Sequence, residues 1–434
     1  MFERWIERWR FGLGVGLVAV AAAAFAVGFR ASLAAVMHGV FGASDVVSAM
    51  RGMPGWLRVA LPALGGLCGG AIGLLSTGRA GGGVGNVMEA VALGRVDLPM
   101  RVTLQKSAAS WLAIASGGSL GREGPLIQFG GAAGKFIGDR LALDAERTRL
   151  LIAAGTAAGF AAAYNTPFAS VLFVLEVVIG VVALEAILPA LVATAISSAL
   201  TRAIAGAGPI YGQRVFQLQS PFELIAFAGL GLGAALGAQA FMRLLSLGED
   251  LFRSGRLPLP WRPALGGAAC GLVLVALPEV AGNGYEPLNA LLDARLSVGF
   301  VALLLVGKCV ATTFSVSSGN PGGVFTPTLL VGGALGYLYG AGLTALGIPA
   351  GPTGGYALVG MAAASAATTH APLMAAVLVF ELSGDYAIVL PLVMATAVAT
   401  VASRWLRRDS IYAAELRERG VGWQMTLEGR RVGE

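Results

Sequence analysis

Two adjacent ionisable residues, Arg122 and Glu123, stand inside a largely apolar segment rich in glycine (residues 116–138), which has one further charge at Lys135. A bare charge at bilayer depth is costly, so an ionisable residue in such a segment indicates a functional site. The surrounding glycines break the incoming helix, and Pro125 fits the first turn of a new one. We therefore expect Glu123 at a helix N-terminus, where free N–H groups and the helix dipole favour negative charge. The segment predicts an anion-binding site next to a carboxylate of the protein itself, that of Glu123.

The composition is that of a polytopic membrane protein. Hydrophobic residues make up 56% of the chain and charged residues 12%, with a mean hydropathy of +0.75. Soluble domains carry roughly 25% charged residues. We expect residues 1–434 to form a single transmembrane domain. The 64 glycines suit close helix packing and broken helices.

The net charge of +6 does not indicate a nucleic-acid partner, because the basic residues concentrate at the two ends of the chain. They are Arg4, Arg8 and Arg10 at one end, and Arg404, Arg407, Arg408, Arg417, Arg419, Arg430 and Arg431 at the other. The positive-inside rule then predicts that both termini are cytoplasmic.

Long apolar helices are predicted at residues 11–38, 56–77 and 181–204. Between them lie helices that are short or interrupted. A glycine-rich break covers residues 80–90, and the sequence Tyr164-Asn165-Thr166-Pro167 separates two short apolar segments at 148–163 and 166–180. Such breaks cannot face lipid, since their free backbone groups would go unsatisfied. We therefore expect them to line a cavity or to be buried in protein.

The chain repeats itself. Residues 318–340 match residues 116–138 at an offset of 202, and Lys106 pairs with Lys308 at the same offset. At an offset of 205, Gly155, Pro167 and Glu176 match Gly360, Pro372 and Glu381. We predict two homologous halves, 11–204 and 221–404, with a linker at 205–220 and a short cytoplasmic segment at 405–434. Corresponding broken helices in two halves indicate a transporter with its site between them.

Three short sequences support a family assignment: GGGVG at 81–85, GREGP at 121–125 and GVFTP at 323–327. In order and spacing they resemble the three anion-selectivity segments of the CLC family of chloride channels and chloride/proton antiporters. The repeat extends this resemblance over nearly the whole chain. Tyr412, shortly after the last apolar segment, resembles the pore-facing tyrosine near the cytoplasmic end of the family's pathway.

The resemblance implies an all-α, CLC-type fold of two inverted repeats, without the C-terminal regulatory domains of some members. It also implies a homodimer in membrane lipid, with a separate pore in each subunit, and no required cofactor. The transported species would be chloride and other small anions, and protons in the exchanging members. A bacterial inner membrane is the expected location. Carried over residue by residue, the anion-binding positions are Gly82, Gly121, Gly124, Gly323, Val324, Phe325 and Tyr412.

Physical chemistry supports this assignment. Several helix N-termini that converge on an anion can hold it at mid-membrane without a full positive charge, and weakly enough to release it. Val324 and Phe325 would offer backbone amides. Glu123 would compete with the permeant anion when ionised and would swing away when protonated, so gate and proton carrier would be one group. The alternative is a static ion pair of Glu123 with Arg122.

Several other residues receive supporting roles. Glu176 and Glu381 are equivalent in the two halves, so we expect them to brace both halves alike. For Lys106 and Lys308 a structural role and a contribution of positive potential near the pore stay equally open. Arg122 has no counterpart in the second half and is predicted to brace its loop, and His370 is predicted to cap a helix start.

Two departures from the family pattern bear on mechanism. Gly82 stands where the family usually has a serine whose hydroxyl contacts the central anion, so preference for chloride over nitrate or bromide is open. Val177 stands where many exchangers have a glutamate that relays protons inward. This favours a channel-like or loosely coupled pathway, with chloride/proton antiport as the alternative.

An intramembrane hydrolase is the remote alternative. It would need a nucleophile with a base in reach. Ser119 lies near Glu123 in sequence, but neither histidine falls in the same motif. The residues favour a transport protein and not an enzyme. The two histidines and three cysteines (Cys68, Cys270 and Cys309) are too dispersed to predict a metal site, and the cysteines are expected to be buried packing residues.

Overall fold

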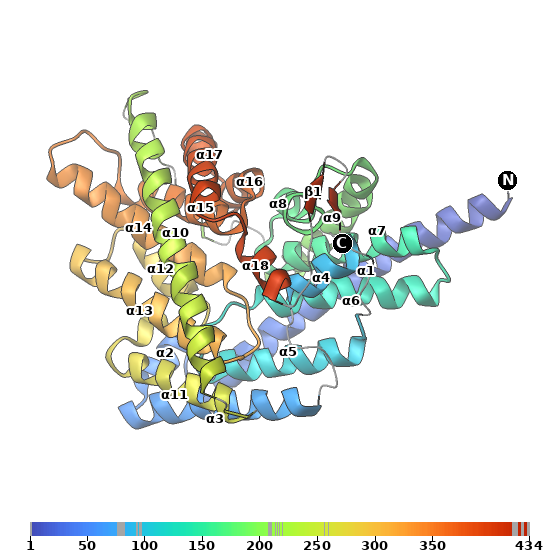
Figure 1. Cartoon of the computed structure of the whole chain (residues 1–434), viewed down its shortest axis with the longest axis horizontal. Coiled ribbons are helices and arrows are strands. Elements are labelled where there is room, and N and C mark those ends of the chain that lie inside the picture. The colour runs from blue at the N-terminus through green and yellow to red at the C-terminus, as the bar shows by residue number, and fades with distance from the viewer. Residues whose placement is uncertain are drawn as a thin grey trace.

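The computed structural model describes residues 2–75, 83–92, 94, 98–206, 211, 212, 214, 216, 218, 220–255, 257, 258, 260–418, 424–426 and 429–431. These residues are almost entirely helical (Figure 1). Up to Ala205 the elements are α1 (Phe2–Phe41), α2 (Val46–Gly52), α3 (Gly55–Leu75), α4 (Val84–Ala92), α5 (Met100–Ala115), α6 (Glu123–Arg140), α7 (Ala145–Tyr164), α8 (Pro167–Leu172), the π-helix η1 (Phe173–Ile179) and α9 (Leu184–Ala205).

From Glu223 onward the elements are α10 (Glu223–Ser254), α11 (Trp261–Ala276), η2 (Pro278–Val280), α12 (Tyr285–Leu292), α13 (Val298–Ser317), α14 (Phe325–Ala345), α15 (Thr353–Thr369), α16 (Pro372–Ser383), η3 (Tyr386–Ile388), α17 (Val389–Leu406), α18 (Ile411–Glu418), β1 (Gln424–Thr426) and β2 (Gly429–Arg431). The two short strands pair antiparallel. The all-α prediction therefore holds for the membrane helices, while the segment after residue 405 contains one helix and this small ribbon.

The predicted helix breaks are present. Helix α5 ends at Ala115 and α6 begins at Glu123, with Pro125 in its first turn. Helix α7 ends at Tyr164, Asn165 adopts the left-handed conformation, and α8 begins at Pro167. The prediction that His370 caps a helix start is wrong. His370 ends α15 in the left-handed conformation, and Ala371 is the residue before α16. His370 and Asn165 thus occupy equivalent turns before a proline.

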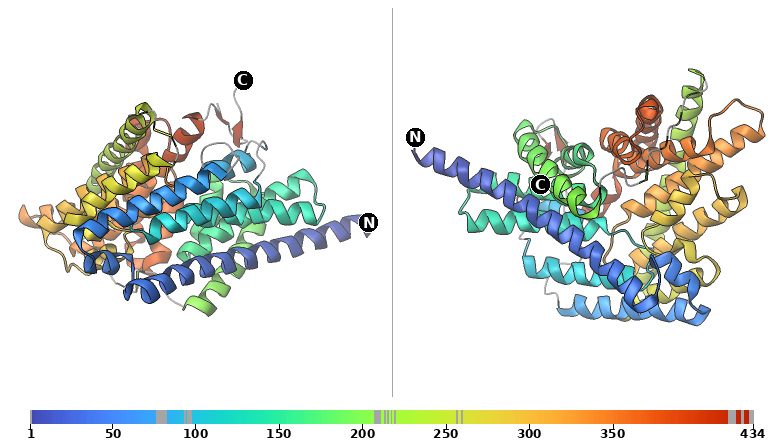
Figure 2. Two further views of the ribbon diagram at one scale, coloured as in Figure 1. Left: turned by 90° about the horizontal axis from the view of Figure 1, so that it is seen from below. Right: turned by 180° about the vertical axis from the view of Figure 1, so that it is seen from behind.

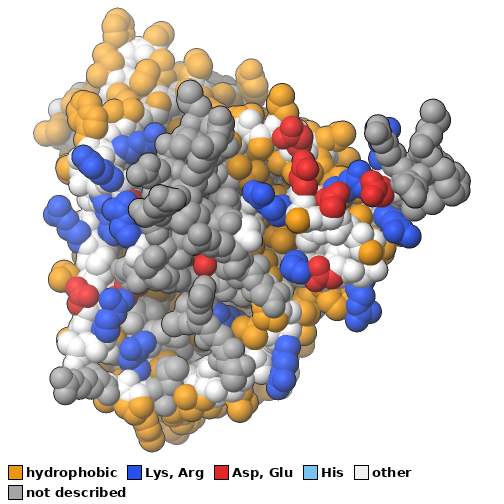
Figure 3. Space-filling view, turned by 45° about the vertical axis from the view of Figure 1, so that its right-hand side comes forward, with side chains coloured by type: hydrophobic (Ala, Val, Ile, Leu, Met, Phe, Trp, Pro, Cys, Tyr) orange, Lys and Arg blue, Asp and Glu red, His pale blue; other side chains and the backbone are white. Residues whose placement is uncertain are grey.

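Seven helical stretches of the described residues are long and apolar enough to cross a bilayer: Glu7–Gly52, Gly55–Leu75, Leu184–Ala205, Glu223–Ser254, Val298–Ser317, Phe325–Ala345 and Tyr386–Arg417. Their outer faces expose large apolar side chains, among them Leu184, Ile225 and Trp405. Figure 3 shows such side chains along the upper and lower margins of one face, with charged side chains spread between them. An apolar outer surface of this extent requires lipid or another apolar partner.

Helices α3 and α11 lie side by side and join the two halves (Figures 1 and 2). Their glycines make reciprocal contacts. A Cβ atom at Gly66 would overlap the Pro263 carbonyl, and one at Gly267 would overlap the Pro62 carbonyl. Glycine is required here because the two backbones touch. Pro62 and Pro263, like Gly66 and Gly267, are 201 residues apart, so the sequence repeat reappears as a symmetric contact.

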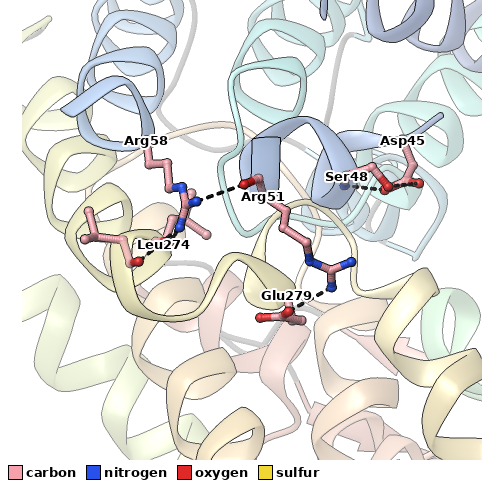
Figure 4. Close-up of polar contacts among 7 residues, drawn as sticks. Asp45, Ser48, Arg51, Arg58, Leu274 and Glu279 are labelled. Atoms are coloured by element: carbon pink, nitrogen blue, oxygen red, sulfur yellow. Dashed lines mark hydrogen bonds and ion pairs between the residues drawn. The ribbon is translucent and has the colours of Figure 1, made fainter. Parts of the chain in front are cut away.

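Polar contacts tie the ends of this pair together (Figure 4). Arg51 at the end of α2 forms an ion pair with Glu279 in η2, at 2.8 Å. Arg58 in α3 donates to the carbonyl of Val275 at 3.1 Å and to that of Arg51 at 2.9 Å. The turn after α2 is thereby fixed against the end of α11.

The three cysteines do not share one environment. Cys270 is buried, Cys309 is partly buried and Cys68 is exposed. The prediction of burial is therefore wrong for Cys68, which lies on α3, a helix apolar enough to cross a bilayer. An apolar pattern in sequence cannot separate a residue that faces lipid from one that faces protein, because both surroundings are apolar.

Candidate anion site

The loops ahead of α6 and α14 are clasped together. Gly121 and Gly323 form an isolated antiparallel bridge, in which the Gly121 N–H donates to the Gly323 carbonyl at 2.7 Å and the Gly323 N–H donates to the Gly121 carbonyl at 2.8 Å. These two glycines are equivalent in the repeat. The bridge therefore sets the N-termini of α6 and α14 against each other, at the boundary between the halves.

Glu123 is the first residue of α6 and is 1% exposed. Its Oε1 atom accepts the Phe325 N–H at 2.8 Å and the Thr326 N–H at 3.3 Å. Its Oε2 atom accepts the Thr326 hydroxyl at 2.8 Å. All three donors belong to the N-terminus of α14. The carboxylate thus occupies a cradle made by the opposite half.

Glu123 lies at the start of α6, as expected, but its carboxylate bonds across to α14. The N–H donors to the carboxylate belong to Phe325 and Thr326, and Val324 is the N-cap residue of α14. The side chain crosses over because the glycine bridge brings the first turn of α14 within its reach.

The glycines of the site leave room for the carboxylate. A Cβ atom at Gly121 or at Gly323 would overlap the Glu123 carboxylate. A Cβ atom at Gly124 would make only ordinary contacts, the nearest with the Gly323 nitrogen at 3.4 Å. Close approach of the carboxylate therefore explains the glycines at Gly121 and Gly323.

Behind the cradle lies a row of aromatic rings. The Phe325 ring packs edge-on to Phe160 and Tyr164, with centroids 5.6 and 5.8 Å away. Phe160 stacks on Phe173 at 4.5 Å, and Phe173 meets Tyr412 edge-on at 6.4 Å. Tyr412, in α18, is therefore connected to the Glu123 cradle through packed rings.

Arg122 makes no ion pair with Glu123 within the described part of the chain. Its side chain is partly exposed, and the hydrogen bonds of the Glu123 carboxylate come from α14. A static pair of these neighbours therefore does not explain where the carboxylate lies.

Glu176 and Glu381 cap helices of the opposite half. Glu176 accepts the N–H groups of Leu373 and Met374, at 3.3 and 2.6 Å, at the start of α16. Glu381 accepts those of Phe168 and Ala169, at 3.2 and 2.8 Å, at the start of α8. The two contacts are equivalent under the repeat, as expected of a pair that braces both halves alike.

Lys106 and Lys308 are equivalent in sequence but lie in different surroundings. Lys308 is fully buried in α13, and its ammonium group donates to the carbonyls of Val280 and Gly282 at 3.0 and 2.8 Å. Lys106 lies on α5 and is partly exposed. The buried lysine thus holds the turn between η2 and α12.

The remaining predicted residues divide as follows. Gly82 lies outside the described residues. Val177 is buried within the π-helix η1. The Ser119 hydroxyl bonds to that of Thr312 at 2.9 Å, and Ser315 contacts the Ser119 N–H at 3.1 Å; no histidine or carboxylate contacts it within the described ranges. Among the residues that the structure describes, no group of His, Cys, Asp and Glu could hold a metal ion.

Sequence reasoning missed Thr326 and Tyr164. The Tyr164 hydroxyl lies 2.6 Å from Thr326 Oγ1, which in turn contacts Glu123. Both residues stand in motifs that the sequence analysis identifies, GVFTP and the Tyr-Asn-Thr-Pro break. The predictions, however, rest on the glycines, prolines and backbone amides of these motifs and not on their hydroxyl groups. The signal was a hydroxyl in each motif, next to a helix terminus.

The fold and this site are those of a polytopic membrane protein in which a buried carboxylate lies at a helix N-terminus, and comparison with known proteins identifies the family. Residues 64–404 match the family described as voltage gated chloride channel. Because the match covers more than half of the chain, the protein belongs to this family, the CLC family, and is a multi-pass membrane protein.

Individual relatives and solved structures extend this result. The chain is 39% identical over 410 residues to a chloride channel protein described as ClcB-like from Ralstonia nicotianae, covering 92% of this chain and 95% of that one. It is 35% identical over 411 residues to the voltage-gated ClC-type chloride channel ClcB of Shigella flexneri, covering 92% and 96%. Its fold is similar to that of a slow cyanobacterial Cl⁻/H⁺ antiporter, with a TM-score of 0.84, 24% identity and coverage of 94% and 98%.

Proposed function

We propose that this protein carries chloride and other small anions across the membrane through the α14 cradle, and that Glu123 is the gate. The observation that carries the proposal is the position of the Glu123 carboxylate, buried on two backbone N–H groups and one hydroxyl of the opposite half. A site that holds a carboxylate with uncharged donors suits a permeant anion, because such donors replace lost hydration without trapping the ion.

Gating follows from competition for these donors. While Glu123 is ionised and in place, an anion cannot use the Phe325 and Thr326 groups. Protonation removes the negative charge that the cradle favours, so the side chain can leave and an anion can enter. Transport rather than hydrolysis is the proposed activity, and the contact of the Ser119 hydroxyl with the Thr312 hydroxyl gives no support to the hydrolase alternative.

Conduction that is channel-like or loosely coupled to protons is the first form of this proposal. It is supported by Val177, which is buried beside Glu176 and carries no proton. Tight chloride/proton antiport is the second form, and the antiporter fold of the solved relatives favours it. The two forms differ in whether an anion gradient can drive protons uphill.

The test uses proteoliposomes with an outward chloride gradient, valinomycin and potassium, read with chloride and proton electrodes together. We expect chloride efflux with little sustained uphill proton movement. Glu123→Gln and Glu123→Ala should keep chloride efflux and lose its dependence on pH. Sustained proton uptake that Glu123→Ala abolishes would establish the antiporter form instead. If both variants fold and stay as pH-sensitive as the parent, Glu123 is not the gate.

The assembly and orientation belong to the same proposal. We propose a homodimer in membrane lipid, in a bacterial inner membrane, with both termini cytoplasmic. The two halves, 11–204 and 221–404, are proposed to be inverted repeats joined by residues 205–220. The symmetric α3–α11 contact and the Gly121–Gly323 bridge support this arrangement.

A further inference from the structure

We propose that Thr326 and Tyr164 form a hydroxyl relay through which Glu123 gains and loses its proton. The relay rests on the proposed function, because it gives the gating carboxylate a proton route in a chain whose position 177 is a valine. Thr326 begins the path on α14, and Tyr164, the last residue of α7, continues it. Tyr412 lies near enough to Tyr164 to act on it electrostatically.

The two oxygens of Glu123 have different kinds of partner. Oε1 is held by N–H groups, which can only donate, so this oxygen must remain an acceptor. Oε2 is held by the Thr326 hydroxyl, which can either donate or accept. A proton can therefore be added at Oε2 without losing a hydrogen bond, but not at Oε1. Thr326 marks the side of the carboxylate that can be protonated.

The direction of the hydrogen bonds in the relay follows from which oxygen atoms carry a proton. With Glu123 ionised, the Thr326 hydroxyl donates to Oε2, so the Tyr164 hydroxyl must donate to Thr326 Oγ1, 2.6 Å away. In the transfer Oε2 takes the Thr326 proton, Thr326 takes the Tyr164 proton, and Tyr164 takes one from a hydronium ion on the Tyr412 side. One O–H bond forms as another breaks at each step. The net change is protonation of Glu123 and release of a water molecule.

Packing fixes the relay in place. Tyr164 and Thr326 are 6% and 3% exposed. The Tyr164 ring lies between Phe160, 4.9 Å away, and Phe325. The titratable or charged groups near enough to act on the Glu123 charge are Arg122 beside it, Tyr164 on α7, Tyr211 in the connection between the halves, Lys308 on α13 and Tyr412 on α18. Among these, only Tyr164 is joined to Glu123 by hydrogen bonds, through Thr326.

The test compares Thr326→Val, which keeps the shape and removes the hydroxyl, with Thr326→Ser, which restores it. Thr328→Val is the matched control, because the Thr328 hydroxyl is equally buried on α14 but bonds to the Val324 carbonyl at 2.8 Å. Tyr164→Phe removes the far hydroxyl without touching the cradle. Its control is Tyr337→Phe, a tyrosine that is also 6% exposed and whose hydroxyl donates to the Leu296 carbonyl.

The readouts are chloride efflux from proteoliposomes, its response to a step in pH, and accompanying proton movement. Thr326→Val and Tyr164→Phe should slow the response to pH and any proton movement by about tenfold or more, the size of one lost hydrogen bond to a charged group. Chloride efflux should change little in Tyr164→Phe, because all three donors of the cradle stay, whereas Thr326→Val also removes one donor to the anion and should lower efflux. Thr326→Ser and both controls should behave as the parent does.

Two results would overturn the relay. One is a pH response and a proton-to-chloride ratio in Thr326→Val and Tyr164→Phe equal to those of the parent. The other is loss of the same size in Thr328→Val and Tyr337→Phe, which would mean that packing alone is responsible. Either result leaves Glu123 gating intact, since that proposal fails only if Glu123→Gln remains pH-sensitive.

Discussion

Glu176 and Glu381 occupy equivalent positions in the two halves and do the same thing, whereas Glu123 and its equivalent, Phe325, do different things. Each member of the first pair caps a helix of the opposite half. In the second pair one residue supplies a carboxylate and the other supplies the N–H that binds it. The symmetric positions thus hold the two halves together, and the asymmetric position forms the anion site that we propose.

The lysine pair shows that equivalence in sequence is not enough. Lys106 and Lys308 match in the repeat, yet one is partly exposed and the other is fully buried against two carbonyls. A shared residue type therefore indicates a shared role only when the surroundings are shared as well. The variants below test this distinction.

The largest effect is expected at the centre of the asymmetric pair. Gly323→Val places side-chain atoms where the Glu123 carboxylate lies, so the cradle must shift. We expect chloride flux to fall on the order of a hundredfold, since a misplacement of about 1 Å at a working site can cost that much. The control is Gly342→Val on α14, where a Cβ atom meets nothing within 4 Å. Normal flux through folded Gly323→Val protein would contradict the proposed site.

A smaller effect, on stability, should separate the lysines. Lys308→Met leaves the buried carbonyls of Val280 and Gly282 without their donor. We expect a loss of about 2–3 kcal/mol in the free energy of unfolding, the range for hydrogen bonds to a charged group. Lys106→Met should cost less than Lys308→Met, because the Lys106 side chain is partly exposed and water can replace its contacts. Thermal unfolding in detergent measures both, and equal losses would show that the two surroundings are alike.

The symmetric carboxylates should respond equally. Glu176→Gln and Glu381→Gln keep the side-chain shape but weaken two charge-assisted hydrogen bonds each. We expect each to lower stability by about 1–2 kcal/mol and neither to change the pH dependence of chloride flux. Unfolding midpoints and proteoliposome flux check the two statements. A loss of pH dependence in Glu176→Gln alone would make Glu176 part of the proton path, and the comparison would then fail.

The smallest effect concerns anion choice. Gly82→Ser adds a hydroxyl in the first-half segment that resembles a family anion site. One neutral hydrogen bond should raise the preference for chloride over nitrate by about two- to tenfold. Uptake of both anions in parent and variant measures the ratio. An unchanged ratio would indicate that the hydroxyl of Thr326 already supplies what this segment lacks.

The sequence predicts those features of the fold and the site that depend on local helix-breaking residues or on the internal repeat. Glycine and proline located the breaks at Ala115 and Tyr164, and the offset of 202 set Glu123 opposite Phe325. Other features depend on how helices cross, which no local pattern reports. Examples are the use of the Thr326 hydroxyl, the identity of the N–H donors and the different surroundings of the two lysines. His370 was misplaced because a residue before Ala-Pro can end one helix as readily as it precedes the next.

The reciprocal caps also set an order of events during synthesis. The N–H of Phe168 at the start of α8 receives its carboxylate from Glu381, which lies 213 residues further along the chain. At about 5–20 residues per second, the ribosome reaches that residue roughly 10 to 40 seconds later. Until then the first half has an uncapped helix start that must remain near water or within the insertion machinery. The start of α16 has no such delay, because Glu176 precedes Leu373 by 197 residues. The two reciprocal caps are therefore complete only after Glu381 has emerged.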